Sequence, residues 1–285
     1  MAICIHTVKE LRELIKSRKA QGQSVGLVPT MGALHQGHAS LIKASVAEND
    51  FTVVSVFINP TQFGPNEDFE AYPRTLDSDL DVVTKAGGDV VFAPNPHEMY
   101  PSADDTWVEV TGQVTHVLCG KSRPIHFRGV TTVVCKLFNI VTPTRAYFGQ
   151  KDAQQVEVLR RIVKDLFFDI DLRIMPINRE DSGLARSSRN TYLSDEEKQA
   201  ATVLSKSLTE ALDLYKSGQR SAAAIIDNTR KIIEKEPLAK IEYIECYGLP
   251  ELYSLKDDKI VSPTLLALAV RFGSTRLIDN IILKE

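Results

Sequence analysis

The sequence predicts an α/β fold, in which a parallel sheet with flanking helices is followed by a smaller α+β domain. Two observations predict it. Segments typical of buried strands alternate with segments of helical periodicity in the first half of the chain, and such alternation produces parallel sheets with right-handed crossovers. After about residue 180 the order changes to two helices followed by strands. The predicted domains therefore span residues 1–180 and 181–285.

The first domain is expected to contain short apolar strands and longer helices in turn. A continuous apolar run such as 51–58 (FTVVSVFI) is typical of a strand buried on both faces, whereas apolar residues at intervals of three and four indicate a helix. The predicted strands are 25–28, 51–58, 89–93, 145–148 and 169–177. The predicted helices are 38–48, 75–86, 129–141 and 152–166, with Gly87–Gly88 ending the second and Asp152 as N-cap of the last.

The second domain is expected to combine two polar-faced helices with two strands. The predicted helices are 195–217 and 221–235, and the predicted strands are 241–247 and 265–272. The boundary between the domains is placed in the charged, glycine-containing stretch 178–185 (NREDSGLA).

Composition restricts the classes of protein to which the chain can belong. It has 285 residues with 34 basic and 37 acidic side chains, a net charge of -3 that gives no support to nucleic-acid binding. The short apolar start runs directly into a charged amphipathic pattern, unlike a signal peptide or a membrane span. The cysteines at 4, 119, 135 and 246 fit no zinc module. We expect a cytoplasmic protein with free thiols, no metal site of its own, and no nucleic-acid or membrane partner.

The segment Pro29–His38 (PTMGALHQGH) joins a predicted strand to a predicted helix. Ligands of parallel sheets bind beyond the carboxyl ends of the strands, and a helix N-terminus there suits phosphate. Gly32 and Gly37 allow a ligand to approach the backbone. Their spacing begins a Walker A loop, but His38 and Ala39 stand where Lys and Ser or Thr would follow. The segment is therefore predicted to bind nucleotide phosphate in a different way.

His35 and His38 are three residues apart, so they share one face at a helix start. Two imidazoles at a phosphate site can donate hydrogen bonds to oxygens that gain charge in a transition state. Two alternatives remain open: the histidines are incidental to a helix-start turn, or they bind a metal. The metal interpretation lacks a third His or carboxylate at helical spacing.

Three further segments carry polar side chains after predicted strands. In 148–155 (FGQKDAQQ), Lys151 can meet phosphate as a point charge, and Gln155 can bind a hydroxyl or carboxylate. In 184–190 (LARSSRN), two serines between two arginines suit a triphosphate. Gln62 follows the apolar run 51–58. Each segment could instead be an ordinary solvated turn or linker, and the basic stretch 123–129 (RPIHFRG) could hold an anion, an acidic neighbour or another subunit.

Seven motifs in order make the sequence similar to the pantoate–β-alanine ligase family. They are VPTMGALHQGH, VSVFINPTQF, AYPRTLDSDL, RPIHFRGVTTVV, YFGQKDAQQ, GLARSSRNTYL and RLIDNI. This family belongs to the nucleotidyltransferases with an H-x-G-H-type signature, which here is residues 35–38. The resemblance implies a Rossmann-like N-terminal domain, a smaller C-terminal domain that closes over the active site, and a homodimer.

The resemblance also implies the reaction and the residues that take part. The family condenses (R)-pantoate with β-alanine to pantothenate, in the coenzyme A pathway, through a pantoyl adenylate made from Mg²⁺-bound ATP. It implies His38 as proton donor, and we place His35 and Lys151 beside it as catalytic residues. It implies Gln62 and Gln155 for pantoate, and Gln62 for β-alanine. The implied ATP-binding residues are Met31, Gly32, Ala33, Leu34, His35, Gln36, Gly37, His38, Gly149, Gln150, Lys151, Asp152, Asn178, Arg186, Ser187, Ser188 and Arg189.

Departures from the family pattern and functional alternatives are part of this hypothesis. The family often has Glu at Gln150, Val at Asn178, and Met, Leu or Lys at Arg186, so any role of these three residues is expected to come from the backbone. A nucleotidyltransferase that keeps its adenylate product, a ligase of another hydroxy acid, and a tRNA-binding synthetase fragment are the alternatives. The region 64–68 and the second domain are candidates for a lid that protects the intermediate from water.

Overall fold

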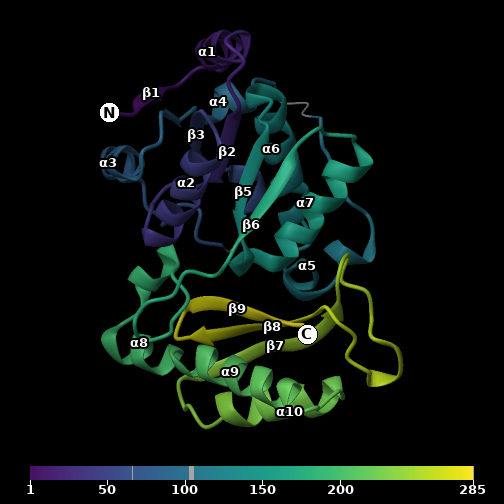
Figure 1. Cartoon of the computed structure of the whole chain (residues 1–285). Coiled ribbons are helices and arrows are strands. Elements are labelled where there is room, and N and C mark those ends of the chain that lie inside the picture. The colour runs from purple at the N-terminus through teal and green to yellow at the C-terminus, as the bar shows by residue number, and fades with distance from the viewer. Residues whose placement is uncertain (66, 103–105, 285) are drawn as a thin grey trace. The chain divides into compact units, whose positions relative to one another are not determined.

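The computed structural model describes residues 1–65, 67–102 and 106–284, and it divides into two compact units (Figure 1). The first unit consists of Met1–Thr111, Ser122–Gly149 and Val158–Pro176, and the second of Gly112–Lys121, Gln150–Glu157 and Ile177–Glu285. Asn66, within the predicted lid region, lies outside the described residues. Within the described part of the chain, no helix combines the length and apolar character that a membrane span requires.

The first unit is built on a six-stranded parallel sheet, as the alternating pattern predicts. Its order is β1-β4-β3-β2-β5-β6. Residues of β2 to β4 are almost all buried, which explains why these strands are continuous apolar runs. The strands are β1 (Ile3–Ile5), β2 (Val25–Thr30), β3 (Phe51–Val56), β4 (Val90–Phe92), β5 (Arg145–Gly149) and β6 (Asp171–Met175).

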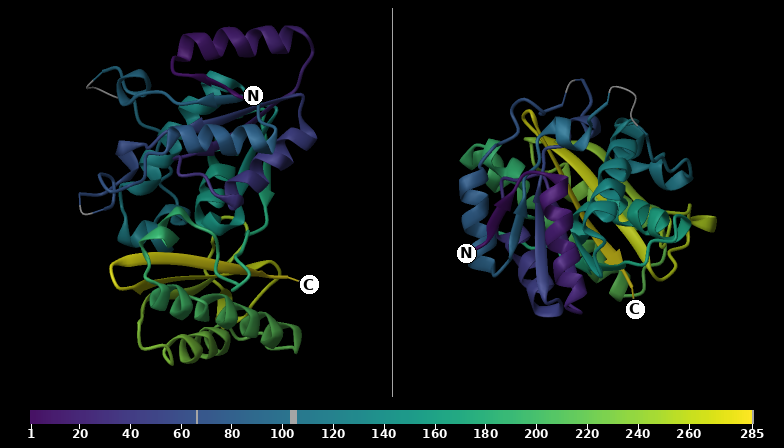
Figure 2. Two further views of the ribbon diagram at one scale, coloured as in Figure 1. Left: turned by 90° about the vertical axis from the view of Figure 1, so that its left-hand side faces the viewer. Right: turned by 90° about the horizontal axis from the view of Figure 1, so that it is seen from above.

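Helices cover both faces of this sheet (Figure 2). Because right-handed crossovers lead from β2 to β3 and on to β4, α2 and α3 share one face, and the crossovers in the opposite direction place α1 and α6 on the other. The helices of the first unit are α1 (Val8–Ala20), α2 (Gln36–Glu48), α3 (Leu76–Ala86), α4 (Pro96–Met99) and α6 (His126–Val141). The helix α5 (Leu118–Ser122) lies almost wholly in the second unit, and α7 (Ala153–Asp165) begins in the second unit and continues in the first. As predicted, α3 ends at a left-handed Gly87, with φ of 89°.

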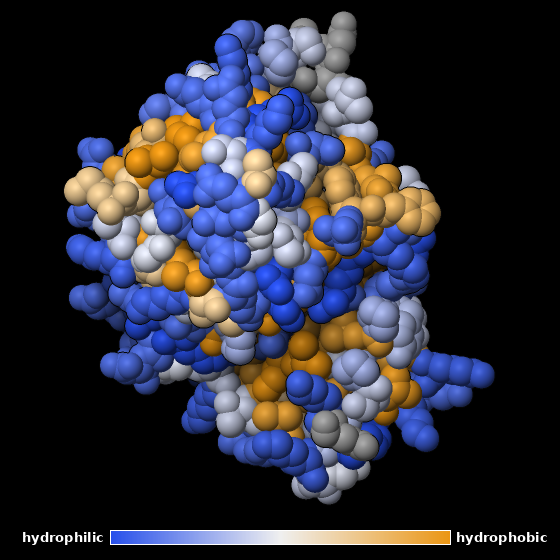
Figure 3. Space-filling view, turned by 45° about the horizontal axis from the view of Figure 1, so that its top comes forward, coloured by the Kyte–Doolittle hydropathy of each residue, from blue (hydrophilic) through white to orange (hydrophobic). Residues whose placement is uncertain are grey.

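The second unit contains a three-stranded antiparallel sheet, with helices packed on one of its faces (Figure 2). Apolar side chains from the helices and the inner face of the sheet form its core. The strands are β7 (Ala239–Gly248), β8 (Thr264–Phe272) and β9 (Thr275–Leu283), and the helices are α8 (Asp195–Ala201), α9 (Val203–Lys216) and α10 (Ala222–Ile233). Hydrophilic residues cover most of the face in Figure 3, and hydrophobic residues form separate patches on it.

Three expectations about the elements are wrong. The strand predicted to stop before Pro29 continues to Thr30, because the missing N–H of Pro29 faces β5, whose pairing with β2 reaches only Leu27. The helix predicted over 195–217 is two helices, which meet at Thr202. The third strand of the second unit, β9, is absent from the prediction because Asp279 and Asn280 interrupt its apolar pattern.

Candidate functional site

A polar loop follows β2 at the carboxyl edge of the parallel sheet. The chain leaves β2 toward β3 on one side, whereas β5 pairs with its other side. Ligands of open α/β sheets bind at such a change of direction in the strand order. Residues Met31–His38, called the histidine loop below, follow β2 at this point, and Gly149 ends the neighbouring strand β5.

A buried carboxylate holds the first half of the histidine loop. Asp79, near the start of α3, accepts the N–H groups of Ala33 at 3.2 Å and Leu34 at 2.7 Å. Gly32 has a φ of 84°, and a Cβ there would lie 3.0 Å from an Asp79 oxygen. Burial raises the pKa of the Asp79 carboxyl, and the bonds from Leu34 and Ala33 offset part of that rise. Because Asp79 accepts these two N–H groups, they are engaged within the protein and are not open to a ligand.

The two histidines shape the second half of the histidine loop. His35 is the N-cap of α2, and its Nδ1 accepts the Gly37 N–H at 3.1 Å. The His38 Nδ1 accepts the His35 N–H at 3.3 Å, and the two ring centroids lie 4.1 Å apart. A ring nitrogen that accepts a hydrogen bond carries no proton, so each neutral imidazole has its proton on Nε2. The pair therefore provides two Nε2–H donors at the start of the helix.

The amide of Gln62 is oriented by its neighbours in the first unit. Gln62 ends a short 3-10 turn after β3 and is 9% exposed. Its Oε1 accepts a hydrogen bond from Asn59 Nδ2 at 3.1 Å. Its Nε2 lies 3.0 Å from the sulfur of Met31, the first residue of the histidine loop. The oxygen end of this amide is thus engaged by Asn59, and the NH₂ end lies beside the loop.

Asn59 is a buried residue of the site that sequence reasoning missed. Its Oδ1 accepts the hydroxyls of Tyr100 at 2.7 Å and Thr61 at 3.0 Å. Its Nδ2 donates to the Gly129 carbonyl at 3.1 Å as well as to Gln62. Two acceptor and two donor contacts leave the Asn59 amide one orientation, and this in turn fixes Gln62. Its place in INPTQF, three residues before Gln62, is the signal that could have found it.

The basic stretch 123–129 supports the Gln62 turn. The Gln62 carbonyl accepts hydrogen bonds from His126 Nδ1 at 3.0 Å and Arg123 Nη2 at 3.4 Å. Arg123 also donates from Nε to Glu67 at 2.6 Å. Burial alone would raise the pKa of Glu67, but the hydrogen bond and charge of Arg123 outweigh it and hold that pKa below its usual value. Gly129 permits the close approach, since a Cβ there would lie 2.4 Å from the Thr61 carbonyl oxygen.

In the second unit, residues Gln150–Asp152 form a 3-10 turn before α7, called the lysine turn below. The buried Asn280 of β9 donates to the carbonyl oxygens of Gln150 and Lys151, each at 3.0 Å. The Gln150 side chain donates back to Asn280 at 3.3 Å. Lys151 Nζ lies 3.7 Å from an Asp152 oxygen. The lysine turn is therefore held through its backbone by a strand that is distant in sequence.

Gln155 is half-buried in the first turn of α7. Its neighbour Gln154 is 6% exposed and is used within the second unit. The Gln154 Oε1 accepts the Cys119 N–H at 2.9 Å, and its Nε2 donates to the carbonyls of Val114 at 2.9 Å and Val117 at 2.7 Å. Of the two adjacent amides, Gln154 is thus structural, and Gln155 is the one suited to a ligand.

Residues Arg186–Arg189, called the serine segment below, follow a hairpin in the second unit. The Arg186 N–H donates to the Asn178 carbonyl at 2.9 Å, and Gly183 turns the chain with φ of 88°. Ser187 caps the next 3-10 turn by accepting the Arg189 N–H at 3.3 Å. The Asn178 backbone, like the Arg186 backbone, is thus part of the hairpin that carries the serines.

The predicted site residues fall into one group in each unit. The histidine loop and Gln62 meet in the first unit, at the Met31 contact. The lysine turn, Gln155, Asn178 and the serine segment belong to the second unit. All four cysteines are free thiols, as expected. A parallel sheet with a histidine-capped helix at the change of strand direction defines the class of this protein, an α/β enzyme that uses a nucleotide.

The chain is similar to one family over almost its whole length. A family model described as pantoate-beta-alanine ligase matches residues 3–282. A pantothenate synthetase of Acetivibrio thermocellus is 55% identical over 280 residues, which cover 98% of this chain and 99% of that protein. The chain therefore belongs to the pantoate–β-alanine ligase family.

Solved structures agree with this membership and confirm the predicted fold class. The crystal structure of pantothenate synthetase from Thermus thermophilus has 41% identity and a TM-score of 0.94, with all of both chains covered. The pantoate-beta-alanine ligase of Francisella tularensis, complexed with beta-gamma ATP and beta-alanine, has 34% identity and a TM-score of 0.80. That comparison covers 99% of this chain and 98% of the other.

Family membership settles the reaction. The chain condenses (R)-pantoate with β-alanine in an ATP-dependent reaction that forms pantothenate. The reaction passes through a pantoyl adenylate and releases pyrophosphate and AMP. A carboxylate is a poor acylating agent because oxide is a poor leaving group, and the acyl–AMP anhydride provides a better one.

Proposed function

We propose that His35 and His38 stabilise the transition state in which pantoate attacks the α-phosphate of ATP; His38, the residue implied as proton donor, does so by donating a hydrogen bond from its neutral ring. The single observation that carries this proposal is that each Nδ1 accepts a backbone N–H, so that each ring donates from Nε2. Hydrogen-bond donors that are already in place where negative charge develops lower the activation barrier, because they need not reorganise during the reaction. The contact between the two rings also keeps them in one arrangement.

Gln62 and Gln155 are proposed to bind pantoate, and Gln62 to lie beside β-alanine as well. The hydrogen bond from Asn59 to Gln62 Oε1 supports this role, because it directs the NH₂ group toward the histidine loop, where one N–H donates to the Met31 sulfur and the other can serve a ligand. An amide N–H suits the carboxylate and hydroxyls of pantoate. The Francisella tularensis relative with bound ATP and β-alanine supports the same two ligands here.

The ATP-binding residues are proposed to be the histidine loop, Gly149, the lysine turn, Asn178 and the serine segment. The first half-reaction brings a carboxylate to a polyanion, so positive charge must offset their repulsion. Lys151 supplies a point charge, while Arg186 and Arg189 can each bind phosphate oxygens through several N–H groups. The cationic groups come from the second unit, and the neutral imidazole donors come from the first.

Mg²⁺ is proposed to enter with ATP. In the described residues, no three His, Cys, Asp or Glu side chains gather as metal ligands would. A site without such a cluster of side chains is compatible with Mg²⁺, because in ATP-using enzymes this ion is held largely by phosphates and water. When bound, it supplies neutralisation of phosphate charge. Lys151 and the serine segment share that task from the protein side.

Exclusion of water is needed because water hydrolyses the acyl adenylate before the amine attacks. We propose that the domain 181–285 and the segment around Gly64–Asp68 close over the site; Asn66 of that segment is outside the described residues.

We also propose that the chain works as a homodimer in the cytoplasm. The four free thiols support a reducing compartment, and light scattering after gel filtration tests the dimer.

One assay tests the proposed chemistry against the adenylate-keeping alternative. ATP, pantoate and β-alanine are supplied, and AMP and pyrophosphate are followed while each substrate is omitted in turn. The proposal expects pyrophosphate from ATP and pantoate alone, limited to about one equivalent per site, and AMP with pantothenate only when β-alanine is added. Continuous adenylate release without the amine would support the nucleotidyltransferase alternative instead.

A further inference from the structure

Asn280 lies in the middle of β9, a strand whose apolar alternation is interrupted by Asp279 and Asn280. Both residues are 3% exposed. Burying two adjacent polar residues costs free energy unless their hydrogen bonds are satisfied. The contacts of these two residues lead to the lysine turn and to the hairpin that carries the serine segment, and both of these lie within the second unit.

The contacts of Asn280 fix how the lysine turn presents its amides. Asn280 Nδ2 binds the carbonyl oxygens of Gln150 and Lys151. In a trans peptide the N–H points opposite to the C=O of the same unit. The N–H groups of Lys151 and Asp152 therefore point away from β9; that of Asp152 closes the 3-10 turn on the Gly149 carbonyl, and that of Lys151 begins the turn and is open to a ligand. An open backbone N–H group at a turn can donate to an anion.

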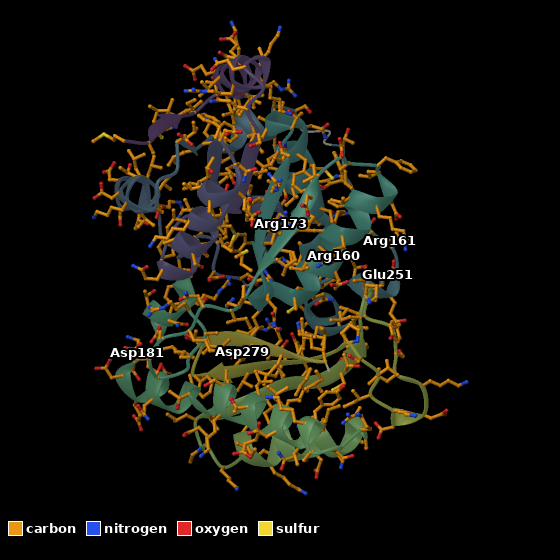
Figure 4. All side chains as sticks on the ribbon, in the orientation of Figure 1. Arg160, Arg161, Arg173, Asp181, Glu251 and Asp279 are labelled. Atoms are coloured by element: carbon orange, nitrogen blue, oxygen red, sulfur yellow. The ribbon has the colours of Figure 1, made fainter. Side chains whose placement is uncertain are left out.

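Asp279, labelled in Figure 4, precedes Asn280 on β9, and because successive side chains of a strand point to opposite faces, it leaves the other face of the strand. Its oxygens accept both terminal nitrogens of Arg179, at 2.6 and 3.0 Å. Arg179 donates to the Gly183 carbonyl at 3.1 Å, and its own carbonyl accepts Arg186 Nε at 3.3 Å. The Asp279 carboxylate also accepts the Asn280 N–H at 2.8 Å. One pair of residues therefore links both segments.

We infer that Asn280 is a positioning residue for ATP, which aims the N–H group of Lys151 at the nucleotide phosphates, and that Asp279 anchors the serine segment to the same point of β9. The inference rests on the proposed role of the lysine turn in ATP binding. It assigns a function to RLIDNI, a motif whose residues touch no substrate in the proposed mechanism. Without Asn280 the two peptide units can rotate, and the Lys151 N–H then loses its direction.

Binding of a non-hydrolysable ATP analogue to the full-length Asn280→Ala variant tests the inference. Titration calorimetry is expected to show the Kd raised about tenfold to a hundredfold, the loss expected when hydrogen bonds to a charged ligand are misaligned. The KM for ATP rises in parallel, while the KM for β-alanine stays within about twofold. A Kd for the analogue within twofold of the wild type would overturn the inference.

Leu277→Ala is the matched control, because Leu277 lies on the same strand but packs into the apolar core. It is expected to lower the Tm and to leave the Kd of the analogue unchanged; a Kd raised equally in both variants would assign the effect to stability and overturn the inference. If Asn280→Ala does not fold, Asn280→Ser keeps one donor and is expected to raise the Kd about threefold to tenfold, and an unchanged Kd would again overturn it.

Lys151→Ala separates this inference from the proposed function on which it rests. If Lys151→Ala weakens analogue binding and Asn280→Ala does not, the positioning role alone is wrong. If neither variant changes the Kd, the proposed role of the lysine turn in ATP binding is wrong as well.

Discussion

The histidine loop is shaped largely by residues within it, whereas the lysine turn is held by an asparagine that is 129 residues away from Lys151. In the loop, the His38 ring accepts the His35 N–H, and the His35 ring accepts the Gly37 N–H. Asp79, which lies outside the loop, accepts two further N–H groups of the loop. The turn has a lysine and an aspartate of its own, but its carbonyl oxygens are bound by Asn280.

This difference separates chemistry from positioning. In the histidine loop the same side chains that set the backbone also present the donors, so a substitution there removes both functions. In the lysine turn the group proposed to bind phosphate and the group that sets the backbone are different residues. If the lysine turn binds ATP as proposed, substitutions on β9 are expected to change ATP binding without removing any side chain that contacts ATP.

The largest effect is expected from His38→Ala. Loss of the Nε2–H donor, and of the acceptor for the His35 N–H, should lower the rate of the first half-reaction by roughly 10²-fold or more. Pyrophosphate release from ATP and pantoate measures this rate. His97→Ala, at an exposed position on α4, is the control. Pyrophosphate release at the wild-type rate in the His38 variant would remove His38 from the mechanism.

A smaller loss is expected from Asp79→Ala, which removes the outside anchor of the histidine loop. Two partly buried N–H groups lose their acceptor, which should cost about 1–3 kcal/mol of stability. The rate of adenylate formation should fall about tenfold, while binding of an ATP analogue to the lysine turn changes less. Asp77→Ala, exposed on the same helix, is the control. Stronger loss of analogue binding than of rate would contradict the separation of the two regions.

Gln155→Ala is expected to weaken the binding of pantoate by about tenfold and the binding of ATP by less than threefold, because the side-chain amide proposed to bind pantoate is lost. Steady-state KM values for the two substrates, measured in the same preparation, give the comparison. The control is Gln154→Ala, which removes a structural amide and should lower stability instead. Equal losses for pantoate and ATP in the Gln155 variant would count against its role.

The smallest effect concerns pH and the Gln62 turn. In the folded protein Arg123 holds the pKa of Glu67 below the ordinary value of 4.5, so this pair stabilises the fold above about pH 4.5 and is lost as pH falls through the lowered pKa. The contribution should be below about 1 kcal/mol, because the pair is partly exposed. The free energies of unfolding of the wild type and of Glu67→Gln, measured with urea between pH 3 and pH 7, should become equal at low pH. Curves that stay parallel would contradict this.

Much of the site is predictable because its residues follow one another in the chain. His35 and His38 stand on a strand–turn–helix segment, and such a turn lies at the carboxyl edge of a parallel sheet. The apolar runs of β2 to β4 are buried on both faces, so composition alone indicates them. These features depend on local order, which the sequence displays directly.

The residues that hold the site were not predictable in the same way. Asp79, Asn59 and Asn280 act on partners that the fold brings to them. Nothing near Asn280 in the sequence indicates that it binds the lysine turn. Asp279 and Asn280 also interrupt the apolar pattern by which β9 would be predicted as a strand. The break at Thr202 is equally invisible, because helical periodicity continues across it.

The central claim is that the pantoate carboxylate attacks the α-phosphate of ATP at the histidine loop. Pantoate labelled with ¹⁸O in its carboxylate tests it most directly, with AMP and pyrophosphate analysed by mass spectrometry after turnover with β-alanine. The account predicts one labelled oxygen in each AMP and none in pyrophosphate, formed at a rate that falls in His38→Ala. Unlabelled AMP, or label in a product of attack at another phosphate, would contradict it.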